Sequence, residues 1–143
     1  MKDMSKKIVV SACLMGRNCK YNGGNNRNEK VLAFLRGHEI IAVCPEVMAG
    51  LGTPRTPVEI VDGNVQTREG VSVDAPLREA VAQILAEAKA LEVDCAVLQS
   101  RSPTCGVNQV YDGTFTGTRV QGSGVLAQAL KDAGIKVIDA EDI

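Results

Sequence analysis

Short apolar runs alternate with segments of helical periodicity along this chain of 143 residues. The runs that are typical of core strands lie at 7–11, 39–43, 95–99 and 135–139. The segments with an apolar stripe at helical spacing lie between them, at 29–36, 76–91 and 124–133. This repeated order of strand, helix and strand is typical of a parallel sheet whose crossover helices pack on its faces.

A single α/β domain over residues 1–143 follows from this pattern and from the length of the chain. We expect a mainly parallel, Rossmann-like sheet with helices on both faces. Asp62-Gly63 is a hairpin signal between the runs 57–62 and 64–68, and it predicts a small β-hairpin that decorates the sheet. The stretch 51–57 contains glycine and proline, so it should be irregular.

Charge and aromatic content exclude several classes of partner. Sixteen Lys and Arg against seventeen Asp and Glu leave a net charge of −1, so no basic field is present to hold a nucleic-acid polymer or an anionic membrane. Aromatic residues make up 3% with no Trp, which disfavours binding of single strands by stacking. The polar N-terminus and the short run after it predict no signal peptide or membrane span, hence a cytoplasmic protein whose five cysteines are reduced.

Three of the cysteines follow predicted strands. Cys13 comes two residues after the first strand, Cys44 ends the second, and Cys105 lies in the loop after the third. Because the carboxyl ends of parallel strands share one edge, where ligands bind in open α/β sheets, we expect these three thiols to meet there. Cys95 opens its strand at the opposite edge and is expected to be a small buried residue, and Cys19 is left unassigned beside the site.

Three thiols with a fourth position open suit either a catalytic zinc ion or a [4Fe-4S] cluster with one iron free of protein ligands. The spacing alone does not choose between them, and the absence of a C-x-x-C pair weakens a thioredoxin-type or zinc-ribbon interpretation. The ordinary alternative is three buried, reduced thiols, since free cysteine is among the most buried residue types. The location of these cysteines in loops with glycine or proline favours function.

Groups for acid and base chemistry are few at this edge. His38, the one histidine, falls at the opposite edge between helix and strand, which nearly excludes Ser-His-Asp and Cys-His catalysis. Glu46, two residues after Cys44, is the nearest carboxylate and is either a helix-start residue or a catalytic acid or base. Ser102 either forms a turn before Pro103 or donates a hydrogen bond into the site.

Several polar groups near this edge could bind an anionic or polar ligand. The side chains concerned are Arg17, Lys20, Arg55 and Arg101, for each of which a solvated loop charge is the default expectation. The turn from Gly122 to Gly124 precedes the last helix and could present backbone N–H groups to an anion, although a plain helix start has the same pattern.

The residues singled out above belong to a set of separated motifs. In chain order these are Val10 to Gly16 (VSACLMG), Asn18 to Gly23 (NCKYNG), Cys44 to Val47 (CPEV), Gly50 to Arg55 (GLGTPR), Ser100 to Gly106 (SRSPTCG) and Tyr111 to Gly117 (YDGTFTG). The set resembles the 2-thiouracil desulfidase family of short bacterial proteins, formerly a family of unknown function. The likeness runs from about Ile8 to the last strand, nearly the whole chain.

The resemblance implies both a site and an activity. In that family three cysteines hold a [4Fe-4S] cluster with one iron free of protein ligands, and the matching positions are Cys13, Cys44 and Cys105. The family's catalytic Glu and Ser correspond to Glu46 and Ser102. The implied reaction is hydrolytic removal of sulfur from a small thiolated nucleobase such as 2-thiouracil, giving uracil and hydrogen sulfide, with the substrate sulfur bound at the open iron. Iron–sulfur assembly machinery is the implied transient partner.

Other functions stay open at this point. A zinc-dependent hydrolase would use the same three cysteines, and metal analysis separates it from the iron enzyme. A non-catalytic iron–sulfur or thiol sensor would bind a nucleobase or persulfide without turnover, and product formation separates it. The least specific alternative is a metal-free α/β domain that binds an anion at the turn 122–124.

Overall fold

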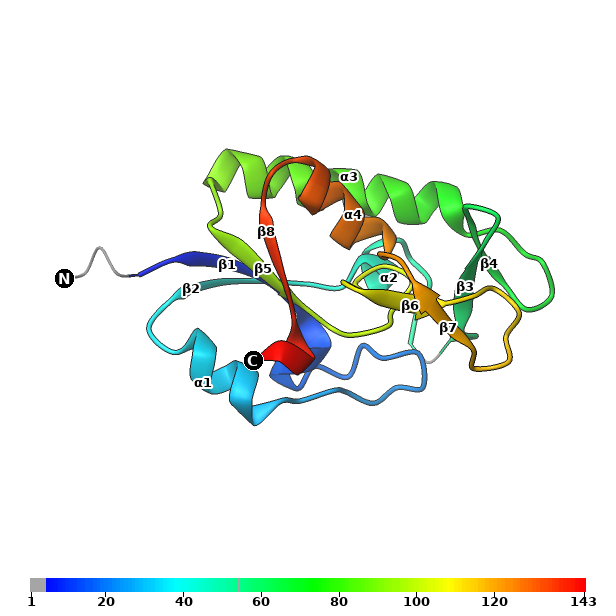
Figure 1. Ribbon diagram of the computed structural model, residues 1–143, viewed down its shortest axis with the longest axis horizontal. Coiled ribbons are helices and arrows are strands. Elements are labelled where there is room, and N and C mark those ends of the chain that lie inside the picture. The colour runs from blue at the N-terminus through cyan, green and yellow to red at the C-terminus, as the bar shows by residue number, and fades with distance from the viewer. Residues whose placement is uncertain (1–4, 54) are drawn as a thin grey trace.

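The computed structural model describes residues 5–53 and 55–143, and its centre is a four-stranded parallel sheet (Figure 1). Its strands, in their order across the sheet, are β2 (Glu39–Val43), β1 (Lys7–Ser11), β5 (Cys95–Leu98) and β8 (Lys136–Asp139). Every neighbouring pair is parallel, and all four residues of β5 are buried. Strands buried on both faces are apolar almost throughout, which is why the apolar runs predicted this sheet correctly.

Helices cover both faces of the sheet, as the sequence predicts. They are α1 (Glu29–Leu35), the four-residue α2 (Pro45–Met48), α3 (Asp74–Leu91) and α4 (Val125–Asp132). Figure 1 shows α1 on one side of the sheet and α3 with α4 on the other. Ile8 and Val10 of β1 belong to the core cluster that contains Val31 of α1, whereas Val9 belongs to the cluster that contains Leu126 of α4. Successive side chains of a strand point to opposite faces, so β1 supports both cores.

Two hairpins lie beside the sheet at the end of the molecule away from the N-terminus (Figure 1). β3 (Val58–Val61) and β4 (Asn64–Thr67) pair antiparallel around Asp62-Gly63, which confirms the predicted hairpin. Both turn residues have positive φ, 50° and 79°, as a tight hairpin turn requires. β6 (Gln109–Tyr111) and β7 (Arg119–Gln121) form a second hairpin that the sequence did not predict.

The predicted element boundaries agree with the structure to within two residues. α3 begins at Asp74 rather than at Pro76, and the Asp74 carboxylate accepts a hydrogen bond of 3.0 Å from the backbone N–H of Val65. Residues 51–53 and 55–57 have no helix or strand, as expected, while Pro54 lies outside the described residues. Within the described ranges no helix is both long enough and apolar enough to cross a lipid bilayer.

The start of α4 packs directly on the loop that carries Cys105. Backbone N–H groups of the helix start donate to carbonyl groups of that loop, Gly124 to Gly106 (2.8 Å), Val125 to Pro103 (2.9 Å) and Leu126 to Thr104 (2.8 Å). A Cβ atom at Gly124 would lie 2.5 Å from the carbonyl carbon of Thr104, so only glycine allows this approach. The helix therefore holds the Cys105 loop in place through backbone contacts.

Candidate active site

A cavity of about 790 Å³ opens at the carboxyl edge of the sheet. Cys13, Cys44 and Cys105 all line it, so the three strand-end thiols meet where the topology predicts. Cys19, left unassigned from the sequence, lines the same cavity, while Cys95 is buried in the α1 core cluster. Four of the five cysteines therefore face one space.

Each of the three strand-end thiols has a polar contact in the structure. The side-chain amide of Asn26 lies 3.5 Å from the Cys13 sulfur, and the Cys44 thiol lies 3.8 Å from the carbonyl oxygen of Cys19. The hydroxyl of Thr104 lies 3.8 Å from the Cys105 sulfur, and Cys105 itself is 5% exposed. The loops after β1, β2 and β5 thus hold the thiols in fixed positions around the cavity.

Burial, with a smaller contribution from neighbouring groups, raises the pKa of three of the cavity thiols, Cys13, Cys19 and Cys105. Burial raises the pKa of Cys13, and the neighbouring Cys44 thiol and Glu46 carboxylate raise it further. Burial raises the pKa of Cys105 to about 12, with added effects from Cys13 and Glu46. Burial, Cys44 and Cys13 raise the pKa of Cys19 to about 12. Burial and neighbouring groups disfavour the thiolate forms of Cys13, Cys19 and Cys105, so a ligand that binds these sulfurs as thiolates must displace their protons.

Glu46 lies in the cavity wall, in the first turn of α2, and forms an ion pair with Arg55. Arg55 Nη2 is 2.5 Å from Glu46 Oε2, and the two side chains are 7% and 13% exposed. The expectation of a solvated loop charge is therefore wrong for Arg55. Arg55 lies in a stretch rich in glycine and proline, where a charged side chain is ordinarily exposed to solvent. The one sequence feature that hints at an ion pair is the carboxylate of Glu46, nine positions earlier.

Ser102 shapes the loop of Cys105. Its hydroxyl oxygen accepts hydrogen bonds of 3.1 Å from the backbone N–H groups of Thr104 and Cys105, and it lies 3.0 Å from the Thr104 hydroxyl. This is the turn-forming arrangement, one of the two that the sequence predicts for Ser102. Ser102 also lines the cavity, so the residue lies at the site although its hydroxyl oxygen accepts hydrogen bonds from the backbone.

Other predicted site groups separate into those at the cavity and those elsewhere. Lys20 and Arg101 line the cavity, and Arg101 forms a two-point ion pair with Glu141 at 2.7 and 3.1 Å. Arg17 is exposed and does not line the cavity. The anion site suggested for the turn 122–124 is wrong, because the first N–H groups of α4 already donate to the Cys105 loop.

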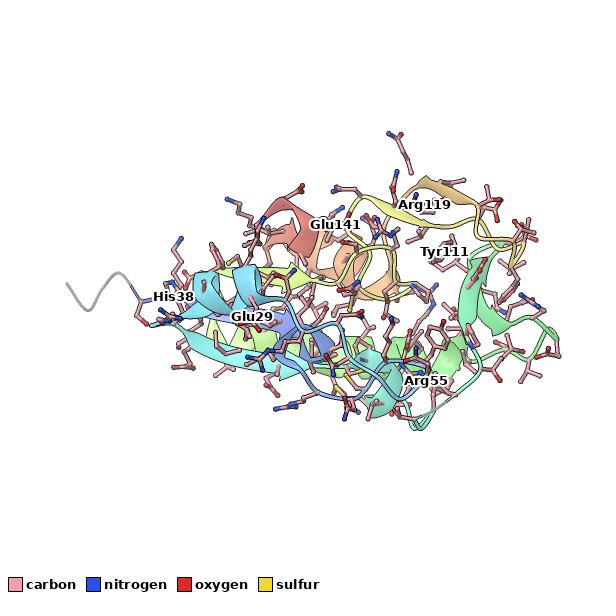
Figure 2. The ribbon with its side chains drawn as sticks, turned by 90° about the horizontal axis from the view of Figure 1, so that it is seen from below. Glu29, His38, Arg55, Tyr111, Arg119 and Glu141 are labelled. Atoms are coloured by element: carbon pink, nitrogen blue, oxygen red, sulfur yellow. The ribbon has the colours of Figure 1, made fainter. Side chains whose placement is uncertain are left out.

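His38 lies far from the cavity, as predicted. Figure 2 shows it near the N-terminal end of the molecule, with Arg55 toward the other end. Its Nδ1 accepts a hydrogen bond of 3.0 Å from the backbone N–H of Lys6, so the ring is a half-buried turn residue with a structural bond rather than a freely solvated one. Imidazole chemistry at the cavity is excluded by this position.

Aromatic side chains gather at the cavity, which the low aromatic content did not predict. The chain has two Tyr and two Phe, and three of these four, Tyr21, Tyr111 and Phe115, line the cavity. Arg68, also in the lining, stacks on Phe115 with its guanidinium 5.7 Å from the ring centroid. Flat aromatic surfaces bind planar ligands by stacking, so the cavity suits a planar molecule.

The cavity thiols are donors of the type that iron–sulfur clusters use. Three thiols from three strand ends are the soft donors that such clusters use, and the cavity has room for a group of several atoms. Within the described ranges, no three His, Cys, Asp or Glu side chains are grouped closely enough to bind one metal ion.

Fold and site together define a Rossmann-like α/β protein with a thiol-lined cavity at the carboxyl edge of its sheet. The chain belongs to the 2-thiouracil desulfurase family, whose model matches residues 8–142, and this confirms the family suggested by the motifs.

Two relatives cover nearly the whole chain. The uncharacterized protein YbbK of Bacillus subtilis (strain 168) is 36% identical over 146 residues, spanning 95% of this chain and 97% of its own. The solved structure of the [4Fe-4S]-dependent thiouracil desulfidase TudS (DUF523Vcz) superposes with a TM-score of 0.89 at 33% identity, covering 97% of this chain and 93% of that one.

Proposed function

We propose that this chain is a desulfidase that removes sulfur from a thiolated nucleobase such as 2-thiouracil by hydrolysis, with a [4Fe-4S] cluster held by Cys13, Cys44 and Cys105. The observation that carries the proposal is the meeting of these thiols with the Glu46 carboxylate in one cavity, in a chain of the 2-thiouracil desulfurase family. The likeness to a [4Fe-4S]-dependent thiouracil desulfidase supports the choice of cofactor.

When bound, the cluster supplies an open, Lewis-acidic iron for the soft thiocarbonyl sulfur. Glu46 takes a proton from the water that attacks the thiocarbonyl carbon and passes it to the departing sulfur. The hydroxyl proton of the resulting intermediate also goes to sulfur as the new C=O forms. The balance is one C=S compound and one water giving one C=O compound and hydrogen sulfide, with no electrons exchanged. Ser102 keeps the Cys105 loop in shape and its hydroxyl hydrogen is available to the substrate or to Thr104.

The aromatic lining supports a planar substrate. Tyr21, Tyr111 and Phe115 offer ring faces against which a pyrimidine can stack, while the polar groups of the wall can bind its ring nitrogens and oxygen. Five unpaired thiols are typical of a protein kept in a reducing compartment. A cytoplasmic location, with the cluster delivered by assembly proteins, is therefore part of the proposal.

The test is purification without oxygen, followed by the visible spectrum, iron and sulfide content, and a hydrogen sulfide assay with 2-thiouracil. We expect a brown protein with about four irons per chain that releases sulfide and forms uracil. Zinc in place of iron would support the zinc hydrolase, and a loaded cluster without product would support the sensor. Either result would contradict the proposal.

Single substitutions assign the residues. Cys13→Ser, Cys44→Ser and Cys105→Ser should each lose the cluster and the activity, because each removes one thiolate ligand. Cys95→Ser is the matched control, since Cys95 is buried away from the cavity and its loss should cost stability alone. Glu46→Gln should keep the iron and lose most of the turnover. An intact cluster in the Cys105→Ser protein would overturn the ligand assignment.

A further inference from the structure

Arg55 is a charged side chain in a nearly buried position, where removing the charge from water costs free energy. Three other ion pairs occur in the described part of the chain, Arg27 with Glu29, Arg78 with Asp74 and Arg101 with Glu141, and each has one side chain at least 50% exposed. The pair of Arg55 with Glu46 is 7% and 13% exposed. Desolvation offsets most of the attraction in such a buried pair, so stability alone is a weak reason for it.

The guanidinium of Arg55 is fixed from several sides. Besides the contact to Glu46, Nη2 donates to the carbonyl oxygen of Cys19 at 2.9 Å. Nη1 donates to the carbonyl oxygen of Gly52 at 3.0 Å and to the hydroxyl of Thr53 at 3.1 Å. Four acceptors on two loops and α2 hold a planar, rigid donor group in one orientation.

Glu46 depends on this one partner. Among the described residues, Arg55 is the only group that donates a hydrogen bond to the Glu46 carboxylate, and it does so at Oε2. Oε1 accepts no hydrogen bond from the described side chains or backbone, and the residue lines the cavity. Arg55 therefore fixes the direction of the carboxylate, while Oε1 has no hydrogen-bond partner among the described residues.

We propose that Arg55 is a positioning residue for the desulfidase reaction, which holds the Glu46 carboxylate with its free oxygen toward the water that attacks the substrate. The inference rests on the function proposed above. Arg55 also lines the cavity, but its guanidinium is engaged by four protein acceptors, so the inference makes it act through Glu46. Because small displacements of a reacting group cost large factors in rate, its loss should lower kcat and leave substrate binding nearly unchanged.

The first test compares Arg55→Met and Arg55→Lys with the wild-type holoenzyme, using 2-thiouracil and rates expressed per loaded cluster. Arg55→Met should lower kcat by about 10- to 100-fold with KM changed less than about threefold. Arg55→Lys should recover part of kcat, because an ammonium group keeps the positive charge beside Glu46. The recovery should be incomplete, because the ammonium group lacks the planar, forked donor geometry of guanidinium. Arg78→Met is the matched control, since it breaks an arginine–carboxylate pair on α3 outside the cavity lining, and its kcat should equal that of the wild type.

A double-mutant cycle separates positioning from a structural role. If Arg55 acts through Glu46, the double variant Glu46→Gln with Arg55→Met should be no slower than Glu46→Gln alone. Losses that multiply in the double variant, or a kcat per loaded cluster that is unchanged in Arg55→Met, would each overturn the inference.

Failure of the proposed function gives a different pattern. A loaded wild-type protein without sulfide release, or a Glu46→Gln variant as fast as wild type, would contradict the function on which the inference rests. A slow Glu46→Gln variant beside a fast Arg55→Met variant would contradict the role of Arg55 alone.

Discussion

The contact of Gly124 with the Cys105 loop predicts a large effect for a single methyl group. Gly124 has φ −67° and ψ 168°, a conformation that alanine adopts freely, so backbone strain plays no part. The added Cβ would lie 2.5 Å from the carbonyl carbon of Thr104, 2.6 Å from its oxygen and 2.8 Å from the oxygen of Pro103. These are backbone atoms, which cannot rotate away as a side chain does.

The loss of stability in Gly124→Ala can be estimated from the displacement of the start of α4 that the added methyl group requires. Overpacking of a close contact costs about 1 to 3 kcal/mol, and a shift of the helix start also weakens hydrogen bonds worth about 1 kcal/mol each. We expect Gly124→Ala to lower the free energy of unfolding by about 2 to 3 kcal/mol and the Tm by about 5 to 10 °C. Because the loop carries Cys105, iron per chain should fall as well.

Urea unfolding and thermal scans of Gly124→Ala and Gly122→Ala provide the measurement. Gly122 is the matched control, because its Cβ would meet only the Cγ2 atom of Val110 at 3.4 Å, an ordinary contact. Equal stability of the two variants would refute the argument that α4 approaches the loop too closely for a side chain.

Three further changes each test a single contact. Asn28→Ala removes the side chain that accepts the N–H of Val31 at the start of α1 and should cost about 1 kcal/mol in urea unfolding, with Asn28→Asp retaining most of the stability. Glu59→Ala leaves two backbone N–H groups of the β6–β7 hairpin without their acceptor and should cost about 1 to 3 kcal/mol by the same assay, whereas no loss would rule out that contact. Burial opposes the ionisation of Asp74, but its hydrogen bonds outweigh burial and lower its pKa, so its stabilisation is present above about pH 4 and lost at lower pH. The gap in urea midpoint between wild type and Asp74→Asn should therefore close between pH 7 and pH 2, and a gap that persists at low pH would contradict this.

Much of the fold was predictable because it depends on burial. The strand expected at 39–43 matches β2, and those expected at 95–99 and 135–139 are one residue longer than β5 and β8, because the middle residues of these strands are apolar and buried or half-buried. The hairpin of β6 and β7 escaped prediction because all three residues of β7 are exposed and its apolar content is low. Four-residue α2 is too short to show a period.

The features of the candidate site were also predictable where they depend on the sheet and unpredictable where they depend on loops. The meeting of Cys13, Cys44 and Cys105 was predictable, because parallel topology brings strand ends together whatever the loops do. The burial of Arg55 was not, because it depends on the path of an irregular segment and on a carboxylate that the fold brings within reach. Sequence patterns report periodicity and strand ends, and they carry little information on how loops pack against each other.

The strand order also sets when the cavity can form during folding. β1, made first, lies in the interior of the sheet between β2 and β5, and the N–H of Lys7 bonds to the Asp94 carboxylate 87 positions along the chain. A nascent chain can pair β1 with β2, but β1 lacks its neighbour on the other side until β5 has been synthesised. Pairings over such separations are slow to form. The last wall of the cavity is therefore added late, and any ligand that needs all three strand ends must wait for the folded sheet.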